Sequence, residues 1–374
     1  MTPDSGVVPV VDAGATPPDG GTGGGGPSWF VHVTDTHFGS GNGGSTLVTS
    51  LLEDVVPVVD PDVAFHTGDI TDNGGHSWAW SSYREALDTR APAYPRWLEI
   101  PGNHDVKDDG APNFLAQSNA GRAGAGLYGH VFVDTPRGRV RVLRTNTADS
   151  ANNFTNIAGV FGEAQQAALL NDAHAAEPAA FTIVLGHHPV LGPERLRLGS
   201  DTRMLQILER FQPPLYFCGH VHTPAVEWTG NTLMVQGRTF GKEGGDSTFM
   251  LAAVDDSGPR VREVPLHPAQ SPSVDWPLVM ITLPADHALG GTNPRAGLLP
   301  AGAVHVRALA FAPSGVTTVE TRVDQGPWQT LTAAGRGVFR GVAAVSSSAG
   351  QHRVEVRAAG NDGTSTDGIT VVGP

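Results

Sequence analysis

Short apolar runs alternate with helical patterns over the first 265 residues. Most runs have the length of a buried strand, about four to eight residues. They are Trp29–Val33, Val63–His66, Trp97–Ile100, Val140–Leu143, Phe181–Leu185, Leu215–Cys218, Leu233–Val235 and Phe249–Val254. Apolar residues at helical spacing occupy Thr46–Val56, Ser77–Asp88, Glu163–Ala176 and Thr202–Phe211. This alternation predicts an α/β domain, and because no clear helices separate the later runs, we expect a mixed or doubled sheet.

The pattern changes near residue 266. Leu266–Trp276 contains several Pro and Ser residues, which indicates a linker between domains. After it, apolar and polar positions alternate, as at Val304 and Val306, and turn signals separate the segments. Because this part of the chain has no helical pattern, we predict an all-β sandwich over residues 277–374, following a first domain at residues 28–265.

The N-terminal segment differs from both domains. Residues 1–27 consist mainly of Gly, Pro, Asp, Thr and Ala, a composition that predicts a disordered, flexible linker. Because such tails often follow a cleaved signal or a lipid anchor, we expect an extracytoplasmic location: secreted, periplasmic, or lipid-anchored before processing. No apolar run reaches the roughly 18–20 residues of a membrane span, so we expect no transmembrane segment.

Composition narrows the range of functions. The chain has 374 residues and a net charge of −13, from 24 basic and 37 acidic side chains. Binding to nucleic-acid backbones requires clustered Lys and Arg, and the sequence has no basic run, so we expect no nucleic-acid-binding surface. Cys218 is the sole cysteine, which excludes an intramolecular disulfide, and we predict that it packs as a small buried hydrophobe. The oligomeric state stays open.

Asp, Asn and His follow five of the apolar runs. The motifs are Thr34-Asp35-Thr36-His37, Gly68-Asp69-Ile70-Thr71-Asp72, Gly102-Asn103-His104-Asp105, Gly186-His187-His188-Pro189 and Gly219-His220-Val221-His222. Ligands of open α/β sheets gather at the carboxyl ends of strands, where all these loops can converge. Oxygen and imidazole donors without thiolate favour Mn, Fe or Zn. There are too many donors for one tetrahedral ion, but they suit two ions that share a bridging carboxylate, as in two-metal phosphoryl transfer.

This ordered set of motifs resembles the signature of the calcineurin-like metallophosphoesterase superfamily. The resemblance covers residues 28–265, with every block intact. It implies an α/β fold of four layers, a double β-sheet sandwich flanked by helices, with a dinuclear metal centre at one edge. The implied cofactors are two divalent or trivalent transition-metal ions (Fe, Mn or Zn), and the implied partner is a small phosphoester substrate.

The resemblance also implies a role for each motif residue. The residues at metal-ligand positions are Asp35, His37 and His222 for the first metal, Asp69 as the bridge, and Asn103, His187 and His220 for the second. His104 would face the phosphate and protonate the leaving oxygen, and Asp72 would orient His104. Asp105 is expected to support its loop. His188 either supports a ligand or packs near Pro189.

Departures from the signature indicate one branch of the superfamily. Protein Ser/Thr phosphatases carry Arg after the second Asp of Gly-Asp-x-x-Asp, and Gly-Asn-His-Glu, where this chain has Asn73 and Asp105. Purple acid phosphatases place a Tyr ligand where this chain has Asp72. The sequence is most similar to the phosphodiesterase branch, which shares Gly-Asp-x-x-Asp-x-Gly, here Gly68–Gly74. The C-terminal region loosely resembles the Ig-like module of a membrane-anchored animal branch.

Three functions compete at this point. The leading prediction is a metal-dependent phosphoesterase that hydrolyses phosphodiester bonds by attack of a metal-activated hydroxide. The first alternative is a phosphomonoesterase acting on small organic phosphates, which usually needs an added Arg or Lys that none of the five motifs contains. The second is a non-catalytic extracytoplasmic binding protein that uses the fold as a scaffold. Scaffold forms tend to lose metal ligands, which are intact here.

Other residues near the motifs have two interpretations. Trp78, Trp80 and Tyr83 either reach the metal edge as substrate contacts or pack inside the helix that they begin. Phe38 and the glycine-rich stretch Gly39–Gly44 are expected to form a mobile lip. Histidines in or beside strands are expected to be structural, namely His32, His66 and His130.

Overall fold

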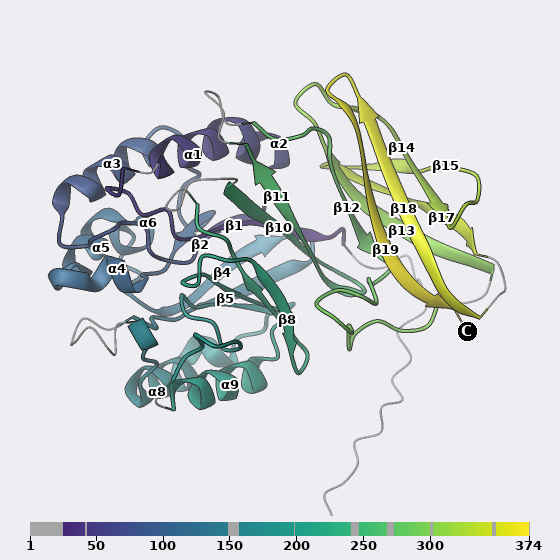
Figure 1. The fold of residues 1–374 in the computed structure, drawn as a ribbon. Coiled ribbons are helices and arrows are strands. Elements are labelled where there is room, and N and C mark those ends of the chain that lie inside the picture. The colour runs from purple at the N-terminus through teal and green to yellow at the C-terminus, as the bar shows by residue number, and fades with distance from the viewer. Residues whose placement is uncertain are drawn as a thin grey trace, which may run out of the picture.

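The chain folds into an α/β region followed by a β-rich region, as the computed structural model shows (Figure 1). The structure describes residues 25–41, 43–148, 157–197, 199–240, 247–267, 273–299, 302–345 and 349–373. Residues 1–24 of the predicted N-terminal linker and 268–272 of the predicted linker between domains lie outside the described residues.

The first sheet of the α/β region is mixed, with strand order β11-β10-β1-β2-β3. Its strands are β1 (Ser28–Val33), β2 (Val63–His66), β3 (Trp97–Glu99), β10 (Ser247–Asp255) and β11 (Gly258–Leu266). The strands β1, β2 and β3 run parallel, whereas β10 pairs antiparallel with both β1 and β11. The parallel strands are buried on both faces, which explains why they read as unbroken apolar runs.

The second sheet has the order β4-β5-β6-β7-β9-β8. Its strands are β4 (Gly129–Thr135), β5 (Gly138–Arg144), β6 (Thr182–Leu185), β7 (Leu215–Cys218), β8 (Ala225–Thr229) and β9 (Thr232–Gln236). The central strands β5, β6, β7 and β9 are parallel, and the edge strands β4 and β8 pair antiparallel with their neighbours. The expected mixed and doubled sheet is therefore confirmed.

Helices cover the outer faces of the two sheets. They are α1 (Gly44–Ser50), η1 (Leu51–Val55), α2 (Val56–Val59), α3 (Ser77–Leu87), α4 (Asn103–Val106), η2 (Lys107–Asp109), α5 (Ala111–Gln117), α6 (Asn119–Arg122), α8 (Glu163–Asn171), η3 (Ala173–Ala176) and α9 (Ser200–Phe211). Leu51 and Trp80 pack on the first sheet, and Met204 packs on the second. Between the sheets, Phe65 and Phe217 share one core. The four layers are those that the sequence predicts.

The sequence patterns do not predict some of the strands or their ends. The edge strands β4 and β8 are half exposed and mix polar with apolar residues, so neither forms an apolar run. The strand β11 ends at Leu266, the first residue of the predicted linker. Among the helices of the described residues, none is both long and apolar enough to cross a membrane.

The β-rich region is a sandwich of two four-stranded sheets, with orders β12-β13-β17-β16 and β15-β14-β18-β19. The strands are β12 (Leu278–Leu283), β13 (Gly302–Phe311), β14 (Val316–Val323), β15 (Gln329–Thr330), β16 (Thr332–Gly335), β17 (Val338–Val345), β18 (Gly350–Gly360) and β19 (Gly363–Gly373). The predicted all-β sandwich is confirmed.

The strand β12 and residues 308–311 at the end of β13 are buried on both faces. These segments join the two regions, which lie side by side in Figure 1. Along β12, Val279 and Ile281 enter the sandwich core, while Leu278 and Met280 enter the core of the α/β region. The rings of Phe311 in β13 and Trp29 in β1 lie 5.8 Å apart between centroids. The junction is thus a continuous hydrophobic core.

Charged side chains surround this apolar junction. Arg336, at the tip of the β16–β17 hairpin, places its guanidinium carbon 4.3 Å from the centroid of the Trp29 ring and donates to Asp62 Oδ1 at 2.9 Å. On the other side, Arg260 of β11 lies 3.3 Å from Asp367 of β19. These pairs fix the orientation of the sandwich on the α/β region.

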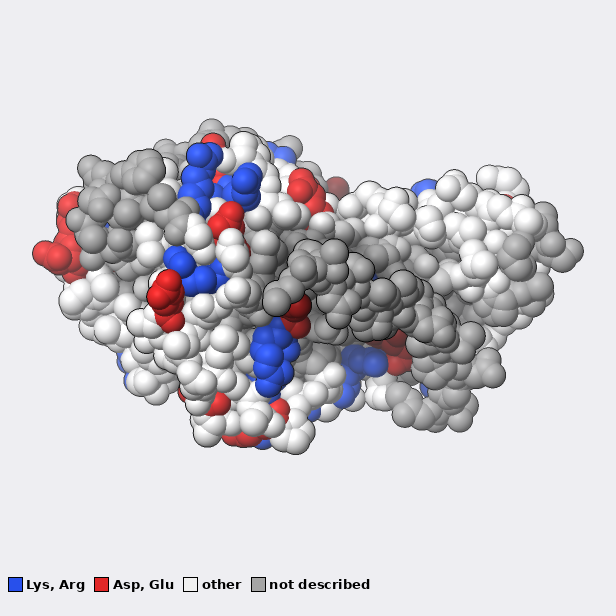
Figure 2. All heavy atoms as spheres, turned by 90° about the horizontal axis from the view of Figure 1, so that it is seen from below, with Lys and Arg blue, Asp and Glu red and all other residues white. Residues whose placement is uncertain are grey.

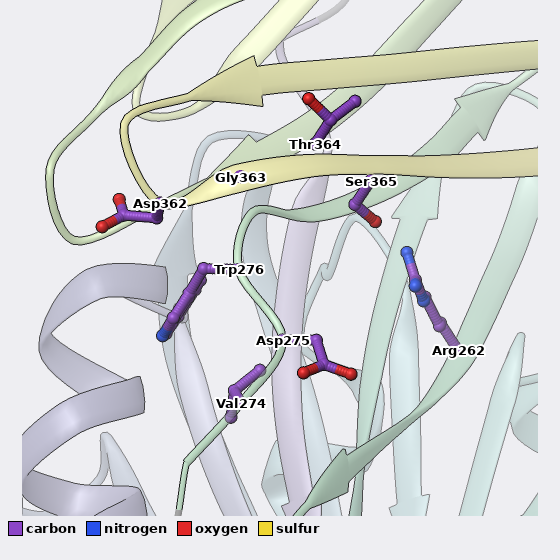
Figure 3. A pocket seen from close by; sticks show the side chains of 8 residues that line it. All are labelled: Arg262, Val274, Asp275, Trp276, Asp362, Gly363, Thr364 and Ser365. Carbon is purple, nitrogen blue, oxygen red and sulfur yellow. The ribbon is translucent and has the colours of Figure 1, made fainter.

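A polar pocket of about 680 Å³ opens beside the junction (Figure 3). Its lining includes Arg262, Asp275 and Ser365, and Figure 3 shows Arg262 extending toward Ser365. The Arg262 guanidinium donates to the Val279 carbonyl, which ties it to the junction. None of the predicted site residues lines this pocket.

Candidate metal centre

Paired loops at the carboxyl ends of the parallel strands carry the predicted site residues. The amide of Asp35 donates to the Gly68 carbonyl at 3.0 Å, and that of His37 donates to the Asp69 carbonyl at 3.0 Å. These bonds continue the parallel pairing of β1 and β2 past the strand ends. Backbone pairing therefore sets the spacing of the first two motifs.

Asp35, His37, Asp69 and His222 form one compact group of donors. Their ligand atoms all lie within 4.8 Å of one another. His37 Nε2 lies 3.2 Å from His222 Nε2 and 3.8 Å from Asp69 Oδ2. His222 Nε2 lies 3.5 Å from Asp35 Oδ1. Four residues that are far apart in the sequence thus direct their donor atoms at one point.

Asp69 directs its other carboxylate oxygen at a second group. Asp69 Oδ1 lies 3.4 Å from His187 Nε2. Asn103 Oδ1 lies 3.0 Å from His187 Nε2 and 3.0 Å from His220 Nδ1. Asp69 therefore stands between the two groups with one oxygen toward each, which is the position that a bridging carboxylate needs.

Several donors hold a left-handed backbone. The residues with positive φ are Asp35 at 53°, His37 at 44°, Asp69 at 51°, His220 at 74° and His222 at 64°. Non-glycine residues rarely adopt this conformation, and each instance costs about 1–3 kcal/mol unless the surrounding structure enforces it. Strain of this kind clusters at functional sites, because it aims side chains that regular backbone would direct elsewhere.

Two motif glycines allow backbone to approach the carboxylates closely. A Cβ on Gly102 would lie 2.3 Å from Asp69 Oδ1. A Cβ on Gly219 would lie 2.3 Å from Asp35 Oδ2. Both distances are far below van der Waals contact, so any other residue at these positions would displace a donor.

Two buried carboxylates give the centre a charge that would favour a bound cation. Asp35 and Asp69 are 0% and 1% exposed. Burial alone would raise their pKa, but the His222 hydrogen bond and the His187 charge lower the pKa of Asp35 to about 2, and the His187 charge and hydrogen bond hold the pKa of Asp69 well below its usual range. Burial opposes protonation of His187, yet the Asp69 charge raises its pKa to about 9. A metal ion would replace that proton, and the donor set of carboxylate, imidazole and amide oxygens fits Mn, Fe or Zn.

Hydrogen bonds from the loops orient the imidazole rings. His187 Nδ1 donates to the Thr67 carbonyl at 2.8 Å, which leaves Nε2 facing the donors. His188 Nδ1 lies 2.9 Å from Thr147 Oγ1, and its ring centroid lies 4.3 Å from that of His220. His188 thus packs against a donor histidine, one of its two predicted roles.

His104 lies at the rim of the two groups. Its side chain is 25% exposed, and its Nε2 lies 4.0 Å from Asp69 Oδ2. Its Nδ1 lies 2.6 Å from the main-chain carbonyl of Asp72, whereas the Asp72 carboxylate lies 3.8 Å away. The structure therefore places the backbone oxygen of Asp72, and not its carboxylate, within hydrogen-bond distance of His104.

Asp105 connects the second and third motifs. Its carboxylate accepts from the amides of Gly102 at 2.9 Å, Thr71 at 2.8 Å and Ile70 at 3.1 Å. Burial, reinforced by the charge of Asp69, raises its pKa to about 6. These bonds agree with the loop-supporting role that the sequence predicts.

The aromatic residues of α3 divide into two kinds. Trp80 and Tyr83 are fully buried, so both pack in the interior. Trp80 Nε1 donates to the Gly74 carbonyl at 2.9 Å and so stabilises the loop of the second motif. Trp78 is 55% exposed and lies against Gly39. Trp78 is therefore the member of this set that stays accessible to a substrate.

Buried polar residues behind the donors were missed or assigned only a general role. Thr67 and Thr147 contact His187 and His188, but a single Thr beside an apolar run is too common to stand out. His32 and His66 are buried, and burial lowers the pKa of each to about 3, which agrees with their expected structural role. His66 Nε2 lies 2.9 Å from Thr36 Oγ1 in the first motif.

Comparison with known proteins identifies the class. The family profile of the calcineurin-like phosphoesterases matches residues 28–224, more than half of the chain. The chain therefore belongs to the calcineurin-like phosphoesterase family, whose members generally use a dinuclear metal centre.

The individual proteins that match this chain have low sequence identity to it. Transmembrane protein 62 of Mus musculus is 24% identical over 331 residues, which cover 80% of this chain and 47% of that protein, so the chain spans about half the length of this curated relative. The structure of GAP50, the anchor in the inner membrane complex of Plasmodium, matches with a TM-score of 0.50 and 15% identity over 67% of this chain and 88% of that one. A 5'-nucleotidase of Candida albicans matches with a TM-score of 0.43 and 15% identity over 65% and 52%. At this identity the GAP50 match concerns the fold alone.

Proposed function

We propose that this protein is a metal-dependent phosphodiesterase. The proposed ligands are Asp35, His37 and His222 for one ion, Asn103, His187 and His220 for the other, and Asp69 as the bridge. The observation that carries the proposal is the position of Asp69, whose two oxygens lie 3.8 Å from His37 Nε2 and 3.4 Å from His187 Nε2. A carboxylate placed in this way would hold two ions at once.

The bound ions and His104 would have different roles in the reaction. Two bound ions would supply Lewis-acid chemistry, by lowering the pKa of a water molecule and neutralising charge on phosphate oxygens. His104 donates its Nδ1 proton to the Asp72 carbonyl, which turns Nε2 toward the donor groups. From this position a protonated Nε2 gives its proton to the leaving oxygen as the ester bond breaks, and an alcohol departs.

A diester fits the motifs better than a monoester. A monoester brings a second negative charge, which favours a nearby Arg or Lys, and none of the five motifs contains either residue. Asp72 and Asp105 add negative charge beside the donors. A phosphomonoesterase acting on small organic phosphates remains the alternative within the class.

The deciding experiment compares hydrolysis of bis(p-nitrophenyl) phosphate with that of p-nitrophenyl phosphate. Metal-free protein is reloaded with Mn, Zn, Fe or Co and assayed beside Asp69→Asn and His104→Ala. Diester hydrolysis that needs metal, is lost in Asp69→Asn and is slower in His104→Ala supports the proposal. A preference for the monoester would instead support the phosphomonoesterase alternative.

A binding role without catalysis is the alternative from another class. The Plasmodium protein that shares the fold is described as an anchor in the inner membrane complex. Both donor groups are intact, which favours catalysis, because a scaffold protein needs neither of these two groups. Two bound ions per chain, without hydrolysis of either ester, would favour the binding role.

Two further proposals concern the rest of the chain. Its strand order supports an Ig-like assignment for the sandwich of β12 to β19. The Gly- and Pro-rich composition of residues 1–27 supports an extracytoplasmic location. Cell fractionation of the tagged protein tests this location, and recovery in the cytoplasmic fraction would refute it.

A further inference from the structure

The carboxylate of Asp72 lies between two histidine rings. The rings of His37 and His104 meet edge to face, with centroids 4.8 Å apart and planes at 89°. Asp72 Oδ1 lies 3.4 Å from His37 Nδ1 and 3.8 Å from His104 Nδ1. The carboxylate therefore faces the Nδ1 atom of each ring, and the other contacts of the two histidines decide which one it serves.

His104 has its acceptor already. Its Nδ1 carries a single proton, and the Asp72 main-chain carbonyl lies 2.6 Å away. A carboxylate oxygen at 3.8 Å is outside hydrogen-bond range. The orientation of His104 is thus set by the backbone of Asp72, which every substitution of the side chain leaves in place.

His37 is arranged the other way round. Its Nε2 faces the donors, 3.2 Å from His222 Nε2 and 3.8 Å from Asp69 Oδ2, so its proton belongs on Nδ1, on the side of Asp72. A carboxylate beside the second nitrogen of a ligating histidine fixes its tautomer and increases its basicity. Asp72 Oδ1, at 3.4 Å, is close enough to His37 Nδ1 for a charge interaction and is nearer to it than to His104 Nδ1, although the distance is longer than that of a hydrogen bond. We infer that Asp72 is a positioning residue for the metal ion bound by His37; the inference rests on the proposed function.

The backbone couples the same two motifs. The Asp72 amide donates to the Phe38 carbonyl at 3.0 Å, and the Phe38 amide donates to the Ile70 carbonyl at 2.8 Å. Asp72 is therefore tied to the residue that directly follows His37. One residue links the first metal group, through its carboxylate, to the proton donor His104, through its carbonyl.

The test measures metal affinity without any substrate. In the full chain, His187→Ala disables the second donor group, and Asp35→Ala disables the first. Asp72→Ala added to the His187→Ala background should weaken Zn²⁺ or Co²⁺ binding about 10–100-fold. Added to the Asp35→Ala background, it should leave the affinity unchanged. Competition with a chelator of known affinity gives the constants.

Matched variants separate positioning from folding. Asp72→Asn keeps an acceptor oxygen and should recover most of the affinity. Asp108→Ala is the control, since its carboxylate accepts from Asn73 Nδ2 at 2.6 Å beside Asp72, and its loss should change neither affinity. The Co²⁺ absorption spectrum of the His187→Ala protein should change with Asp72→Ala and not with Asp108→Ala. Circular dichroism of the metal-free variants reports folding.

Three outcomes would overturn the inference. They are unchanged affinity in the His187→Ala background, equal weakening in both backgrounds, and a third bound ion that Asp72→Ala removes. The third outcome would make His37, Asp72 and His104 a metal site of their own, because their ligand atoms also lie within 4.8 Å of one another. If the wild-type protein binds two ions but hydrolyses no ester, only the proposed function is refuted. If the enzyme is active but Asp72→Ala leaves the metal affinities unchanged, only this inference is refuted.

Discussion

The metal centre and the junction with the sandwich are built in opposite ways. At the centre, polar side chains lie on irregular backbone, with left-handed φ angles at residues such as Asp69 and His220. At the junction, regular strands bury Leu278, Met280 and Phe311. Strained, charged clusters cost stability, whereas apolar strand faces supply it. This chain therefore places its charged donor groups at strand ends and the packing that stabilises the fold in strand interiors.

Asp69→Asn should have the largest effect on the metal centre. With the bridging charge gone, we expect activity below detection and at most one tightly bound ion per chain, because both groups share this carboxylate. Metal analysis and diester hydrolysis measure the two quantities. Full activity in this variant would show that Asp69 is not the bridge.

His104→Ala should reduce diester hydrolysis by about 10²–10⁴-fold, the usual contribution of a general acid, while both ions stay bound. The loss should be larger for an alkyl ester than for a p-nitrophenyl ester, since nitrophenolate leaves without a proton. Comparing the rates for the two leaving groups checks this. His130→Ala, a half-buried histidine that bonds to the Leu169 carbonyl, is the matched control. Equal losses for both leaving groups would argue against proton donation.

Phe311→Ala should have the largest effect at the junction. It opens a cavity against Trp29 and should lower the free energy of unfolding by about 3–5 kcal/mol, measured by urea denaturation. The folded fraction should keep its metal content. Val342→Ala, on an exposed position of β17, is the control and should change stability by less than about 0.5 kcal/mol. A small effect of Phe311→Ala would mean that the sandwich is only loosely attached.

Arg336→Ala should have a smaller effect at the same junction. It leaves the Asp62 carboxylate buried without its guanidinium, which should cost about 1–3 kcal/mol in the free energy of unfolding. Arg336→Lys keeps the charge but loses the fork and the stacking on Trp29, so it should recover part of the loss. If the alanine variant is as stable as wild type, apolar contacts alone hold the junction.

The smallest expected effect is the coupling between the two regions. Changes at distant sites without shared partners add to within about 0.5 kcal/mol. His104→Ala should therefore lower activity by the same factor in the Phe311→Ala protein as in wild type, assayed at a temperature where both are folded. A clearly different factor would show that the junction acts on the chemistry, and the separation described above would fail.

The sequence predicts which residues gather at the centre better than it predicts their backbone conformation and contacts. The order of motifs behind apolar runs was enough to identify His187 and His220 as neighbours, because parallel strands end at one edge. Left-handed φ angles at Asp35 and His222 could not be predicted, since tertiary contacts impose them on residues that do not favour them. The carbonyl contact of His104 was also inaccessible, because a motif shows side chains and not backbone oxygens.

The junction was predicted least well, although the sequence contains a signal for it. The run Leu278–Ile281 is apolar at every position, whereas a sandwich strand with one wet face alternates. Unbroken hydrophobicity in an otherwise alternating region indicates burial from both sides. The edge strands β4 and β8 gave no such signal, because half of each faces solvent. On the face shown in Figure 2, Lys and Arg side chains of the described residues lie interspersed with Asp and Glu side chains.

Because β12 and the end of β13 are buried on both faces, they determine where the protein can be divided into fragments. A fragment that ended in the segment before β12 would expose the Trp29 face of the first sheet to water, and the detached sandwich would expose Leu309 and Phe311. Both fragments would carry an open apolar patch of the kind that drives aggregation. For protein engineering, the α/β region and the sandwich therefore have to be transferred together, and a hybrid protein that exchanged the sandwich would need a new apolar partner for β1.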